Sequence, residues 1–96
     1  MQQENGQQIQ IKISEEVQKG LYANAAQITH TAEEFALDFL NIFPPGGVVN
    51  ARIFMSPGHV KRFADTLVDV IKKYETQFGA ITLSESPQPK IGYKTE

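Results

Sequence analysis

The residues of this sequence whose types and spacing could do chemistry fall into two groups, and the first is a pair of opposite charges. Asp38 and Arg52 lie in two segments in which apolar and polar residues alternate. If the segments pair as antiparallel strands with Phe35 opposite Met55, then Asp38 lies opposite Arg52 on the other face. The simpler interpretation is a structural ion pair, worth a few tenths of a kcal/mol to about 1 kcal/mol. The alternative is that both charges line a polar binding site.

The second group is basic and follows Ser56 and Pro57, a pair typical of the start of a helix. It consists of His59, Lys61 and Arg62. The amino end of a helix carries partial positive charge and can hold an anion, yet basic side chains are unfavourable there. We therefore weigh binding of an anion or a partner against an ordinary solvated helix face.

Motifs for catalysis, metals and phosphate are missing from the sequence. There is no cysteine, and His30 and His59 lack the spacing of metal ligands. Residues 44–47 contain two glycines but no following Lys-Ser/Thr, so they predict a hairpin loop instead of a phosphate loop. We expect no catalytic residue, no metal and no cofactor. The enzymatic alternative is a carboxylate site at Asp38, and it needs a concave pocket around that residue.

Strands are predicted wherever apolar residues alternate. One is expected at residues 9–13, which contain three alternating isoleucines, and another within residues 21–31. Matching Ile28 to Leu37 places His30 beside Phe35. Residues 32–43 also fit a helix with a capping box at Thr31, which would favour a ribbon-helix-helix dimer. We prefer a strand, because the strictly alternating residues 49–55 need an antiparallel neighbour.

One long amphipathic helix is predicted from Pro57 to Phe78, with Gly79 at its end. The expected fold class is α+β, an antiparallel sheet of about four strands followed by this helix. Residues 8–79 form the predicted domain. Residues 1–7 are expected to be flexible, and residues 80–96 a polar, mobile tail in which Ile81 and Leu83 could add a short edge strand.

Length and charge narrow the function further. The chain has 96 residues and a formal net charge of -2, which argues against nucleic acid as a partner. No signal peptide or membrane helix is predicted, so a cytoplasmic location is expected.

A sheet of four strands is about 19 Å wide and a helix only about 10 Å, so one helix leaves apolar surface uncovered. We therefore predict a homodimer or higher oligomer built on the sheet.

Many of these residues together resemble a family of short bacterial and archaeal proteins catalogued as domain of unknown function 3467. The similarity covers about residues 8–79, and it rests on Asn24, Glu34-Phe35, Asp38-Phe39, Arg52, Ser56-Pro57, Lys61-Arg62, Tyr74-Glu75 and Phe78-Gly79. The resemblance implies a strand-rich domain that ends in one long helix. It implies no activity, and no catalytic residue is carried over from it.

The function predicted from these observations is a small, non-enzymatic, homo-oligomeric protein-interaction module with a possible protein partner. Its candidate binding residues are Asp38 and Arg52 on the sheet, and His59, Lys61 and Arg62 at the helix start. Two alternatives stay open at this point. One is a nucleic-acid-binding accessory protein that uses the helix start, and the other is a small enzyme with its carboxylate at Asp38.

Overall fold

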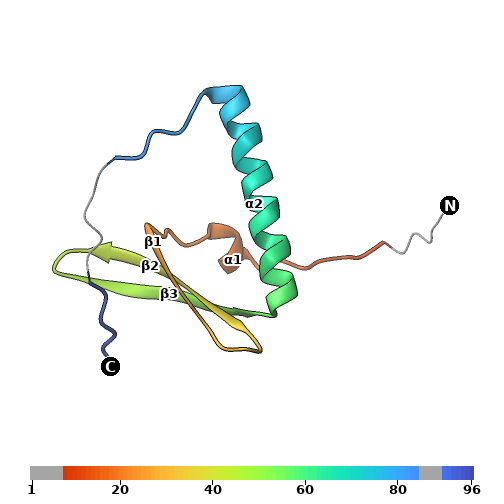
Figure 1. Cartoon of the computed structure of the whole chain (residues 1–96). Coiled ribbons are helices and arrows are strands. Elements are labelled where there is room, and N and C mark those ends of the chain that lie inside the picture. The colour runs from red at the N-terminus through yellow and green to blue at the C-terminus, as the bar shows by residue number, and fades with distance from the viewer. Residues whose placement is uncertain (1–7, 85–89) are drawn as a thin grey trace. The chain divides into compact units, whose positions relative to one another are not determined.

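The computed structural model describes residues 8–84 and 90–96. Its elements follow the chain as α1 (Glu15–Lys19), β1 (Ala25–His30), β2 (Phe35–Phe43), β3 (Gly46–Met55) and α2 (Pro57–Phe78) (Figure 1). The predicted α+β class, a sheet followed by a long helix, is confirmed. The chain divides into two compact units, Met1–Pro57 and Gly58–Glu96, and each is described by itself. The predicted flexible segment 1–7 lies outside the described residues, as does part of the predicted tail.

The sheet is antiparallel with the strand order β1-β2-β3. Both predicted registers are confirmed: Phe35 lies opposite Met55, and His30 lies opposite Phe35. Residues 35–43 form a strand, so the helical alternative and the ribbon-helix-helix dimer that depends on it are wrong. Between Phe39 and Leu40 a bulge shifts the register of β3 by one residue. Strict alternation over residues 49–55 predicts that Val49 and Ala51 share a side of the sheet. Because of the bulge, Val49 instead pairs with Leu40 and lies on the other side.

The fourth strand predicted at residues 9–13 is wrong: these residues lie in no strand, and the sheet of the described chain has three. Residues 14–20 contain α1. Ser14 begins this helix by accepting a hydrogen bond from Val17 N at 3.2 Å, and Gly20 ends it at φ 75°. Alternation decides which residues share one side of an extended segment. A strand also needs the edge of another strand to pair with, and that edge comes from residues far away in the sequence.

The buried core of the first unit is small and lies on the central strand. Leu37 and Leu40 are 3% and 4% exposed, and they are the buried hydrophobic residues among those described. β2 is the most buried strand because it alone has a neighbour on both sides. Asp38 lies between the two leucines and is equally buried, at 4% exposed. A charged residue therefore occupies the centre of the sheet.

The second unit contains nearly all of α2, whose predicted bounds are confirmed. The helix spans 22 residues, about 33 Å, and begins at Pro57. It ends before Gly79, which has φ 95° and donates a backbone hydrogen bond to Glu75 at 2.8 Å. The Glu75 carboxylate also accepts from Ile81 N at 2.9 Å. Neither helix of the described residues combines the length with the hydropathy that a membrane-spanning segment requires.

The tail beyond α2 has no regular secondary structure where the structure describes it, in residues 80–84 and 90–96. The edge strand considered for Ile81 and Leu83 is therefore not formed. Leu83 is 87% exposed. The mobility predicted for this tail stays a prediction.

Candidate functional site

The centre of the candidate site is the predicted pair of Asp38 and Arg52, which the sheet brings into direct contact. Arg52 Nε donates to Asp38 Oδ1 at 2.7 Å, and Arg52 Nη2 donates to Asp38 Oδ2 at 2.9 Å. Two parallel bonds between a guanidinium and a carboxylate are the strongest and most directional form of this interaction. The register across β2 and β3 places the two residues opposite each other. The structure confirms that they form an ion pair.

Burial of the two charges is unequal. The side chain of Asp38 is 6% exposed, whereas that of Arg52 is 50% exposed. A buried carboxylate needs hydrogen-bond donors, because leaving it unpaired away from water is costly. Arg52 therefore supports Asp38 more than Asp38 supports Arg52. This asymmetry favours a structural role for Asp38.

A shallow pocket of about 240 Å³ opens beside the exposed part of Arg52. It lies in the first unit, between the β1–β2 connection and β3. Its lining consists of Thr29, His30, Thr31, Glu34, Ala36, Arg52 and Phe54. Asp38 is not in this lining, so the pocket does not give a ligand access to the carboxylate that the enzymatic alternative requires.

The rim of the pocket is set by the turn between β1 and β2. Thr31 Oγ1 accepts hydrogen bonds from Glu33 N at 3.2 Å and Glu34 N at 3.3 Å, while Thr31 N donates to Glu34 O at 2.9 Å. The Thr31 pattern that suggested a helix cap therefore closes a turn between strands. His30 stacks on Phe35 with ring centroids 5.3 Å apart. His30 thus packs against Phe35, the neighbour that the predicted register gives it.

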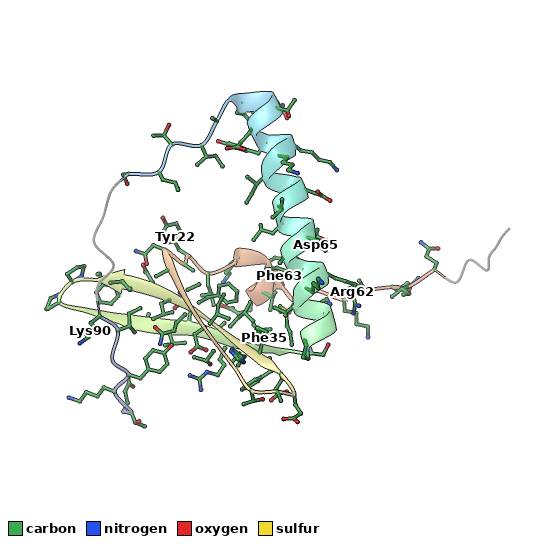
Figure 2. The ribbon with its side chains drawn as sticks, viewed as in Figure 1. Tyr22, Phe35, Arg62, Phe63, Asp65 and Lys90 are labelled. Carbon is green, nitrogen blue, oxygen red and sulfur yellow. The ribbon has the colours of Figure 1, made fainter. Side chains whose placement is uncertain are left out.

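The helix-start residues belong to the other compact unit. His59, Lys61 and Arg62 lie in the first two turns of α2 and are exposed. Arg62 is labelled in Figure 2, together with Phe63 and Asp65 from the same helix. The candidate residues are therefore divided between a closed ion pair on the sheet and an exposed basic group on the helix. Binding by either group stays a prediction.

Two asparagines of the first unit, Asn24 and Asn50, bind backbone groups with their side chains, a role that the alternation of apolar residues does not predict. Asn24 continues the β1–β2 ladder with its side chain: its Nδ2 donates to Ile42 O at 3.0 Å, and its Oδ1 accepts from Ile42 N at 2.8 Å. Its own backbone N donates to Leu40 O at 2.9 Å. Asn50, the extra residue at the bulge, donates from Nδ2 to Tyr22 O at 2.6 Å. The presence of Asn24 in the family resemblance was the signal that could have singled it out.

The described residues contain no cluster of metal-ligating side chains. In residues 8–84 and 90–96, no group of three or more His, Cys, Asp or Glu side chains is arranged to hold a metal ion. The arrangement instead offers an internal ion pair, a shallow pocket and apolar side chains at the surface.

Comparison with known proteins places the chain in a family. The model of a family described as "Protein of unknown function (DUF3467)" matches residues 1–83. No curated protein and no solved structure matches the chain.

Proposed function

The chain belongs to the DUF3467 family of proteins of unknown function, and we propose from its own residues that it is a small, non-enzymatic interaction module that associates with a second copy of itself. The observation that carries the proposal is the mismatch between a very small buried core and a large exposed apolar surface. Two hydrophobic residues are buried among those described, while α2 has no buried residue at all.

The magnitudes explain why this mismatch matters. Ordering the backbone of one residue costs about 1–2 kcal/mol, while burying one leucine gains about 1.5–3 kcal/mol. Leu37 and Leu40 alone cannot offset the ordering of a domain of this length. The apolar stripe of α2 contains residues such as Leu67, Ile71 and Phe78, which are 47%, 38% and 66% exposed. Covering this stripe against another molecule supplies the missing burial.

A second copy suits this surface because the charges of the two parts of the chain are opposite. Residues 1–56 carry three cations and six anions, whereas residues 57–79 carry four cations and three anions. Contact between the acidic part of one copy and the mildly basic helix of another is therefore favourable. The same modest charges offer little affinity for nucleic acid, which requires several cations directed at phosphates.

The proposal that the protein is not an enzyme is supported by the hydrogen bonds of Asp38 and by its position relative to the pocket. Both of its oxygens accept hydrogen bonds from Arg52, and the neighbouring pocket is not lined by it. A general acid or base must lie within hydrogen-bond reach of its substrate, and the carboxylate of Asp38 is held by Arg52. The cytoplasm remains the predicted compartment of this module.

The test is sedimentation velocity on the full chain at tens of micromolar, with a matched pair of variants. Leu67 lies on the apolar stripe, while Thr76, nine residues on, points to the opposite side of an ideal helix. We expect the unmodified chain to sediment as a dimer or larger. L67K should raise the dissociation constant of the dimer at least tenfold, and T76K should leave this constant unchanged.

Two other results would count against this proposal. A folded, monomeric unmodified chain would contradict the proposal. Salt-dependent binding of DNA or RNA that is lost when Lys61 and Arg62 are both changed to Glu would favour the nucleic-acid alternative instead.

A further inference from the structure

Residues 8–13 have the sequence of a strand but are not part of one. Their isoleucines alternate with glutamine and lysine, the pattern of a strand with one apolar side. In the structure Ile9, Ile11 and Ile13 are 80%, 85% and 58% exposed. Within the described residues, no backbone hydrogen bond reaches residues 9–13. A segment well suited to pairing is therefore left without a partner strand.

The sheet has an open edge of matching length. β1 has six residues, the same number as segment 8–13, and its outer side has no neighbouring strand among the described residues. Natural sheets protect their edges with proline, lysine, other charges or bulges. The sequence AAQITH of β1 contains none of these. The other edge strand, β3, has both the bulge at Asn50 and the charge of Arg52.

We propose that residues 8–13 of one copy pair with the outer edge of β1 of a second copy, and that the exchange is reciprocal. Each chain carries one donor segment and one acceptor edge, so two identical contacts satisfy both chains around a two-fold axis. The pairing supplies the fourth strand that the sequence pattern predicts. It rests on the self-association proposed above and adds to the α2 stripe a second contact, at the edge of the sheet.

The side chains agree with this pairing. In an antiparallel register with Ile11 opposite Ile28, the neighbouring Ile13 lies opposite Ala26, on the apolar side that includes Leu37. The polar residues then fall on the other side, where Lys12 lies opposite Gln27. No like charges oppose each other. Ile28, 58% exposed in the single chain, gains a cross-strand aliphatic neighbour.

The absence of cysteine makes a direct test simple. Ile11→Cys and Ile28→Cys are introduced into separate copies of the full chain that carry tags of different length. The two proteins are mixed and oxidised with copper phenanthroline. Directly opposed residues in an antiparallel pair are close enough for a disulfide. We expect a mixed disulfide dimer at a yield at least fivefold above that from I28C mixed with Gln10→Cys, whose side chain points to the other side.

Each outcome decides the proposal. A mixed dimer above the Q10C control supports strand exchange between copies. A yield no greater than the control overturns it, as does an internal disulfide in dilute I11C/I28C double variant, which would mean that each segment pairs with its own β1. Sedimentation of the unmodified chain separates the two ideas: a dimer without this cross-link leaves self-association standing, whereas a monomer contradicts both.

Discussion

Asp38 and Arg52 form a two-bond ion pair across β2 and β3 in which the carboxylate is almost completely buried and the guanidinium is half exposed. The pair holds a charge on the central strand, where Leu37 and Leu40 are the other buried residues among those described. Its two members depend on each other unequally. Water can solvate Arg52 when its partner is lost, but it reaches Asp38 poorly.

This inequality predicts an asymmetric response to substitution. Arg52→Met takes two charged donors from a buried carboxylate and should lower the free energy of unfolding by about 2–3 kcal/mol. Asp38→Asn keeps a polar group of similar shape and leaves a half-exposed cation, so it should cost about 1 kcal/mol. Urea denaturation at one fixed protein concentration measures both. Equal costs, or a larger cost for D38N, would contradict the assigned asymmetry.

The side chain of Asn24 should protect the backbone of Ile42. Asn24→Ala removes both hydrogen bonds to Ile42, at a cost of about 1–2 kcal/mol, and should speed hydrogen exchange of the Ile42 amide. Asn24→Asp keeps the acceptor for Ile42 N but loses the donor to Ile42 O. NMR exchange rates should therefore show Ile42 N protected in N24D and exposed in N24A. Identical exchange in the two variants would show that the acceptor oxygen has no such role.

The two glycines at the start of β3 should respond differently to alanine. A Cβ atom at Gly47 would lie 2.9 Å from the backbone oxygen of Asn41 and 3.1 Å from the Cα of Ile42, closer than normal contact. A Cβ atom at Gly46 would meet nothing within 4 Å. G47A should therefore destabilise the chain by about 1–3 kcal/mol, as expected when backbone must shift, and G46A should change little. Thermal unfolding of both variants checks this, and equal melting temperatures would refute it.

The glycines at the two ends of α2 should give opposite effects. Gly79 has φ 95°, a conformation that strains an L-residue, so Gly79→Ala should destabilise the chain by about 1 kcal/mol. Gly58 lies in the first turn, where a Cβ atom would meet only Arg62 Nη1 at an ordinary 3.7 Å. Gly58→Ala should stabilise the chain by about 0.5–1 kcal/mol. Circular dichroism melts of the two variants should shift in opposite directions. Shifts of the same sign would show that the helix ends are not set by these conformations.

Periodicity alone determined a large part of this fold. The parity of apolar residues indicated which residues share a side of each strand, and parity also limits which registers match those sides. The positions of Phe35 opposite Met55, His30 beside Phe35 and Asp38 opposite Arg52 therefore followed from residue numbers. The bounds of α2 followed equally locally, from Pro57 at its start, Gly79 after its end and apolar residues at spacings of three and four.

Contacts between distant residues decided the rest. Whether residues 9–13 become a strand depends on an available edge, which their own alternation cannot reveal. The bulge at Asn50 and the replacement of a backbone partner by the Asn24 side chain both depend on how strands meet across the sheet. The unequal burial of Asp38 and Arg52 likewise arises only when β2 lies between two neighbours. Local patterns specify the side that a residue presents, but pairing partners and burial come from segments far apart in the chain.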